Sequence, residues 1–92
     1  MNYMKVKWIH SIPDEPVLLY SEIDDDRWEL RKIEVYQDGK TGFAGPGVAH
    51  GGSKLSKEPL PSLSQIAGDP QFEPSAISQP EFEAAWDKAT SG

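Results

Sequence analysis

Three runs of β-forming residues, separated by two turn signals, lie in the segment VLLYSEIDDDRWELRKIEVYQDGKTGFA, residues 17–44. Aromatic and branched aliphatic residues recur in each run, as they do in strands. The pattern predicts strands over Val17–Ile23, Trp28–Tyr36 and Thr41–Ala44. The first strand begins with four apolar residues in succession, which indicates that part of it is covered on both faces.

The two intervening segments are typical of hairpin loops. Asp24–Asp26 suits the first connection, and Asp38-Gly39 predicts a type I′ turn with positive φ at both central residues. Upstream, Tyr3–Ile9 alternates apolar and basic residues and predicts another strand, followed by a turn between Pro13 and Pro16. Connections this short imply an antiparallel meander of about four strands.

The third strand changes phase along its length. Trp28 and Leu30 occupy even positions, whereas Ile33 and Val35 occupy odd ones. We expect a bulge near Arg31-Lys32, or a strand contacted from both sides. The alternating charges of this strand also predict cross-strand ion pairs, with Arg31 as a candidate.

The second half of the chain is more interrupted. Residues 45–80 hold eleven of the sixteen glycines and prolines, so we expect a loop region without long strands or helices. A short helix is plausible over 61–67, and a clearer one over 80–90 has an apolar stripe, Phe82, Ala85, Trp86 and Ala89. We therefore predict one α+β domain over 1–92, with a strand-rich part at 3–44 and a helix against the sheet.

Composition narrows the possible functions. The chain has 92 residues, no cysteine and a net charge of −6. These values argue against a disulfide framework and against direct nucleic-acid binding. Neither a membrane span nor a signal peptide is predicted, and we expect a cytoplasmic protein.

The chain contains no catalytic or metal motif that meets the usual spacing. His10 and His50 stand forty residues apart without cysteines beside them. The glycine-rich segment 45–52 matches neither a dinucleotide fingerprint nor a P-loop, and we interpret it as a flexible surface loop. Ser53 follows Gly51 by two residues, but Leu55 stands where a nucleophile elbow has its second glycine. We expect no enzyme activity, no metal and no cofactor.

The acidic run between Pro13 and Asp26 is the most unusual feature of the sequence. It contains six carboxylates and no basic residue: Asp14, Glu15, Glu22, Asp24, Asp25 and Asp26. Such a run is compatible with a catalytic pair, with a cation site, with a docking surface for a basic partner, or with a solvated loop beside ion pairs. We predict that these six residues bind a protein partner.

Three tryptophans, Trp8, Trp28 and Trp86, are most simply core residues, although an exposed one would suit an interface anchor.

Several motifs carry a family resemblance over about residues 3–89. They include KVKWIH at 5–10, LYSEID at 19–24, Arg27-x-Glu29-x-Arg31-Lys32-x-Glu34, and Phe82-Glu83-x-x-Trp86. The chain resembles a small bacterial domain family of unknown function, and some members of that family are similar to immunity proteins of contact-dependent inhibition and related polymorphic toxin systems. The resemblance implies no catalytic residue and no cofactor.

The leading hypothesis is an immunity protein that binds a cognate toxin domain of the nuclease class, because a nuclease surface is basic. Two alternatives stay open. One is a small enzyme or a metabolite- or metal-binding domain that uses His10 or His50, and the other is an accessory subunit. The sequence does not define the oligomeric state.

Overall fold

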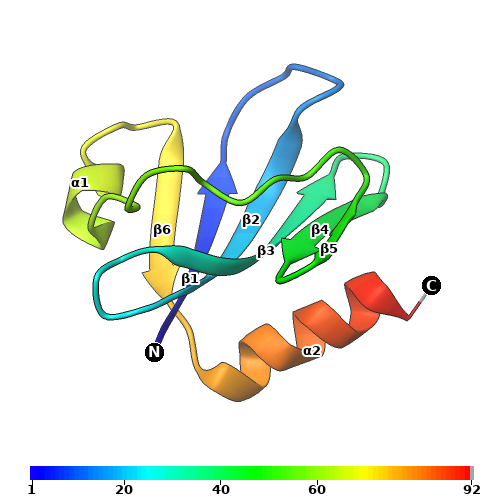
Figure 1. The fold of residues 1–92 in the computed structure, drawn as a ribbon. Coiled ribbons are helices and arrows are strands. Elements are labelled where there is room, and N and C mark those ends of the chain that lie inside the picture. The colour runs from blue at the N-terminus through cyan, green and yellow to red at the C-terminus, as the bar shows by residue number, and fades with distance from the viewer. Residues whose placement is uncertain (92) are drawn as a thin grey trace.

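The computed structural model describes residues 1–91 as an antiparallel sheet with a helix on one face and a loop segment on the other (Figure 1). The strands and helices, in chain order, are β1 (Asn2–Trp8), β2 (Pro16–Ile23), β3 (Glu29–Tyr36), β4 (Thr41–Gly45), β5 (Val48–His50), α1 (Leu63–Ala67), β6 (Phe72–Ala76) and α2 (Gln79–Thr90). The strand order is β5-β4-β3-β2-β1-β6. The predicted α+β class and the antiparallel meander are confirmed, with six strands instead of about four.

The two added strands lie at the two edges of the sheet. β5 forms a tight hairpin with β4, in which Gly45 pairs with Val48 and Gly47 has φ +73°. Proline followed by a glycine of positive φ is typical of a type II turn, so the interpretation of 45–52 as an irregular flexible loop is wrong over this hairpin. β6 pairs with β1 and contains Pro74, a residue that sheets tolerate at an edge.

The turn at Asp38-Gly39 differs from the expected type I′. Gly39 has φ +86°, but Asp38 does not have positive φ, and the Gly39 amide donates to the Tyr36 carbonyl at 3.0 Å. Tyr36 in turn donates to the Lys40 carbonyl at 2.9 Å. This is a three-residue loop, in which a type I turn precedes a glycine in the left-handed region.

The predicted irregularity of β3 is present one residue earlier than expected. Ile23 pairs with Glu29 and Glu22 pairs with Arg31, which leaves Leu30 as an extra residue. A bulge of this kind shifts the alternation of the strand. Glu29 therefore faces the loop segment together with Lys32, while Arg31 faces α2, and the strand is contacted from both sides.

The helix-covered face is built around α2. Ser78 caps the helix, Phe82 is fully buried, and Trp86 meets Phe43 edge-on at 5.5 Å between ring centroids. Ile33 is buried on the same face. The predicted apolar stripe thus packs against the sheet, and none of the helices in residues 1–91 is long and apolar enough to cross a membrane.

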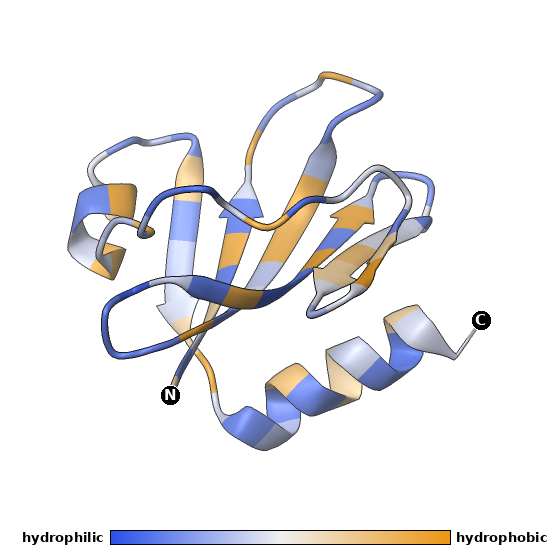
Figure 2. Cartoon of the chain, in the orientation of Figure 1, coloured by the Kyte–Doolittle hydropathy of each residue, from blue (hydrophilic) through white to orange (hydrophobic). Residues whose placement is uncertain are grey.

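The opposite face is covered by residues 51–62, which we name the strap, and by α1. The buried side chains here are Met4, Val6 and Ile23, and half-buried residues of the strap, α1 and β6 close over them. Figure 1 shows the strap crossing the sheet in front of β1 and β2, with α1 beside β6. Figure 2 shows a hydrophobic stretch in the first half of β2. Val17–Tyr20 are half-buried, as expected for a strand covered on both faces.

Candidate functional site

The six carboxylates predicted to bind a partner do not form one surface. Asp14 and Glu15 precede β2, and Asp24–Asp26 follow it. Since a strand rises about 3.3 Å per residue, the eight residues of β2 separate the two groups by roughly 25 Å. The structure therefore offers two separate acidic ends.

Asp24 holds the shape of the β2–β3 connection. Its Oδ1 accepts hydrogen bonds from the amides of Asp26 and Trp28, each at 2.9 Å. Arg27 has φ 68°, and its amide donates to the Asp24 carbonyl at 2.9 Å. Aspartate at the start of a turn commonly binds its own backbone in this way. Asp24 therefore stabilises the turn, in addition to carrying a negative charge.

The residues that this turn presents to solvent are Asp25, Asp26 and Trp28. The Asp25 side chain is 93% exposed, with the N-terminal ammonium 3.8 Å away. Trp28 is 44% exposed, so the expectation of a core tryptophan is wrong at this position, whereas Trp8 and Trp86 are half-buried. We name residues 24–28 the acidic loop.

Glu22 belongs to a different environment, beneath α2. Both of its carboxylate oxygens accept from Arg31, at 2.8 and 2.9 Å. Arg31 also donates to both oxygens of Glu83 on α2, at 3.0 and 2.7 Å. These contacts confirm the predicted cross-strand ion pair of Arg31. The Glu22 side chain is only 12% exposed, so its charge is directed into the fold.

Arg31 controls the protonation of its neighbours. Its hydrogen bonds lower the pKa of Glu22 and the pKa of Glu83 below the usual range, and those carboxylates raise the pKa of Arg31. The guanidinium also lies 4.9 Å from the ring centroid of Phe82 and 5.0 Å from that of Trp86. Arg31 thus connects β2, β3 and α2.

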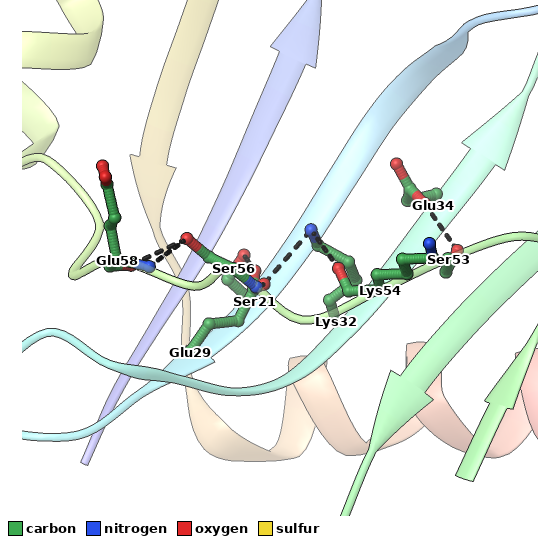
Figure 3. Close-up of polar contacts among 8 residues, drawn as sticks. All are labelled: Ser21, Glu29, Lys32, Glu34, Ser53, Lys54, Ser56 and Glu58. Carbon is green, nitrogen blue, oxygen red and sulfur yellow. Dashed lines mark hydrogen bonds and ion pairs between the residues drawn. The ribbon is translucent and has the colours of Figure 1, made fainter.

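A second polar network lies on the strap side of β3 (Figure 3). Glu29 Oε2 accepts from Ser21 Oγ at 2.8 Å, and Oε1 accepts from the Ser56 amide at 2.9 Å. Lys32 Nζ lies 3.1 Å from the same Oε1 and donates to the Lys54 carbonyl at 2.9 Å. The side chains of Glu29 and Lys32 are 1% and 17% exposed. This buried pair ties the strap to the sheet.

The two histidines lie in different surroundings. His10 Nδ1 accepts from the Ile12 amide at 2.9 Å, which makes Nε2 the donor to the Pro16 carbonyl at 2.8 Å. His50 stacks on Phe43 with ring centroids 5.3 Å apart. Within residues 1–91, no three histidine or carboxylate side chains gather in an arrangement that would hold a metal ion.

The sequence had not singled out Glu29 and Lys32 as a pair. The two residues differ by three positions, so strict alternation would place them on opposite faces. The phase change between Trp28 and Ile33 was the available signal, because a bulge between Glu29 and Arg31 brings Glu29 to the face of Lys32.

A family model described as "Domain of unknown function (DUF6881)" matches residues 2–91 of the chain. The chain belongs to the DUF6881 family. The predicted membership of an uncharacterised domain family is thus confirmed, and the match spans every helix and strand of this DUF6881 protein. No curated protein and no solved structure matches the chain.

Proposed function

We propose that this DUF6881 protein is an immunity protein, which binds a cognate toxin domain of the nuclease class in the cytoplasm of the producing cell. The observation that carries the proposal is the acidic loop. It presents two exposed carboxylates, Asp25 and Asp26, beside a half-exposed tryptophan, on a turn that Asp24 fixes. No catalytic step and no cofactor is part of the proposal.

The chemistry of the acidic loop fits a basic protein surface. A nuclease must hold a polyanion, so its substrate surface is positively charged, and an acidic partner complements it. The net charge of −6 adds long-range attraction to the same partner. Trp28 supplies the large apolar contact that commonly dominates the energy of an interface.

The rigidity of the acidic loop also favours binding. The Asp24 amide donates to the Trp28 carbonyl at 3.0 Å, and the Leu60 amide donates to the Arg27 carbonyl at 2.8 Å. The Arg27 side chain donates to the carbonyls of Leu60 and Pro61. A loop that is ordered before binding loses less conformational entropy when the complex forms.

The test is co-expression with the toxin domain encoded beside the gene, read out by growth and by the association rate of the two purified proteins. The variant D25K/D26K changes the net charge of the acidic loop from −2 to +2, and it spares Asp24, which the turn requires. We expect association to slow by about 10- to 1,000-fold at low ionic strength, the range that electrostatic steering supplies. Added salt should slow the wild type and affect the variant far less.

The opposite end of β2 provides a matched control. D14K/E15K makes the same change in charge in another exposed loop. It should retain protection and should slow association only through the smaller net charge. W28A should weaken the complex by about 30-fold or more through faster dissociation, because an anchor residue contributes about 2 kcal/mol or more. Normal protection by D25K/D26K, or loss of protection only in D14K/E15K, would remove the acidic loop from the interface.

A further inference from the structure

A pocket of about 350 Å³ opens between the sheet and the segment formed by the end of the strap, α1 and the start of β6. Its floor consists of Met4, Val6 and Leu19 from β1 and β2, and its walls include Leu60, Ile66 and Phe72. Small-molecule sites occupy roughly 300–1,000 Å³ and are mostly apolar with few polar groups. This pocket has both properties.

The pocket exists because the strap face lacks a long helix. α1 has five residues and packs beside β6, and the strap is tied down over β3 through Ser56 and Lys54. Between these two supports, Leu19, Leu60, Ile66 and Phe72 stay half-buried around the buried Met4 and Val6. The pocket is therefore defined by contacts at its two ends.

One side of the pocket is polar. Ser21, Glu29 and Lys32 line it next to the apolar floor. The Glu29 carboxylate already accepts from Ser21 and Ser56, and it forms an ion pair with the Lys32 ammonium at 3.1 Å. An ammonium carries three donors, and the hydrogen bond to the Lys54 carbonyl engages one of those of Lys32, beside its ion pair with Glu29. Lys32 thus keeps donors that a ligand at the polar side of the pocket could engage.

We propose that this pocket binds a small, uncharged, mostly apolar molecule with a single hydrogen-bond acceptor, such as a carbonyl, directed at Lys32. The charged residues of the lining are Lys32, Glu29 and Asp69, which sum to −1. The whole chain carries −6. Both values disfavour an anionic ligand, and the apolar floor disfavours a strongly hydrated one.

The proposal is tested with the fluorophore Prodan, an uncharged naphthalene with one ketone oxygen whose emission moves to the blue in apolar surroundings. Titration of the wild-type protein should produce a saturable blue shift. Amide chemical shifts in the wild type should change at Ser21, Leu60 and Phe72 and stay constant along α2. Anilinonaphthalene sulfonate, which adds a phenyl ring and a negative charge to the naphthalene, should bind more weakly.

Two tryptophan variants separate this pocket from other surfaces. I66W fills the pocket and should weaken Prodan binding by about tenfold or more. I9W places the same side chain at an exposed position outside the pocket and should bind as the wild type does. The proposal is overturned if Prodan gives no saturable shift, or if I66W and the wild type bind it with equal affinity. It is also overturned if the chemical-shift changes are confined to other residues, or if the sulfonate binds more tightly than Prodan. The wild-type chemical shifts decide the matter even if I66W fails to fold.

Discussion

The two faces of the sheet are covered by different kinds of structure, and adjacent residues of β3 attach each cover. Arg31 faces α2 and binds the carboxylate of Glu83, whereas Lys32 faces the strap and binds the backbone carbonyl of Lys54. A helix satisfies its own backbone hydrogen bonds, so it offers side chains to the sheet. An irregular segment has free amides and carbonyls, so the sheet must supply partners for them. Glu29 and Lys32 fill that role.

The two cations also differ in a way that suits their tasks. The planar guanidinium of Arg31 makes paired hydrogen bonds to two carboxylates and lies near two aromatic rings. A lysine ammonium is a compact charge that reaches one carboxylate and one carbonyl. The arginine therefore joins a helix to the sheet through side chains, and the lysine joins an irregular segment to the sheet through its backbone.

The largest expected effect contrasts one phenylalanine from each face. F82A removes a fully buried ring that contacts Tyr3, with ring centroids 5.3 Å apart, and that lies beside Arg31. We expect a loss of about 3–5 kcal/mol in the free energy of unfolding. F72A removes a half-buried ring beside the pocket and should lose clearly less. Urea unfolding of both variants measures the difference, and equal losses would mean that the two faces are packed alike.

The next effect concerns the buried pair under the strap. K32M leaves the Glu29 carboxylate without its cation, and removal of one partner from a buried pair costs about 3–5 kcal/mol. E29Q/K32M keeps an acceptor for the Ser56 amide and should recover most of that loss. K54M is the control, because Lys54 joins this network through its carbonyl and its side chain is exposed. A K32M protein as stable as K54M would show that the pair does not hold the strap.

The smallest effect is the response of the helix-covered face to acid. Glu22 and Glu83 have folded-state pKa values below the ordinary value of 4.5, so their ion pairs stabilise the protein above that pH. This contribution should be lost as the pH falls below about 4.5 toward the lower folded-state values. E83Q should flatten the decline of the urea midpoint between pH 5 and pH 3, modestly, because Glu83 is partly exposed. The control is D87N, which changes an exposed carboxylate of the same helix and should leave the pH dependence of the urea midpoint as in the wild type. If E83Q also leaves this pH dependence unchanged, the Glu83 ion pair is not a source of acid sensitivity.

The helix-covered face was predictable from local patterns. The turn signal at Asp38-Gly39 leads into β4, and the apolar stripe of 80–90 identifies the side of α2 that packs. The alternating charges of β3 predicted a cross-strand pair for Arg31, although its place opposite Glu22 depends on the bulge at Leu30. These features depend on spacings within one element or across one short turn, which the sequence displays directly.

The strap face was not predictable in the same way. β6 contains a proline and few strand-forming residues, and its partner β1 lies more than sixty residues away in the chain. Its pairing is imposed by tertiary contacts, which override a weak local propensity. The pair of Glu29 and Lys32 depends on a bulge at Leu30, whose position a change of phase indicates only approximately.

The proline in β6 has a consequence for the behaviour of the molecule at high concentration. Ile77 donates to the Tyr3 carbonyl and Ile9 donates to the Gln71 carbonyl, so the odd-numbered residues of β6 bond to β1 and the even-numbered amides point outward. Pro74 stands in the middle of that outward row, where it has no amide hydrogen to offer. A strand from a neighbouring molecule would miss its central donor along this edge, and the opposite edge, β5, is only three residues long. Both open edges are thus poor templates for further strands, which protects the sheet against growth into fibrous aggregates.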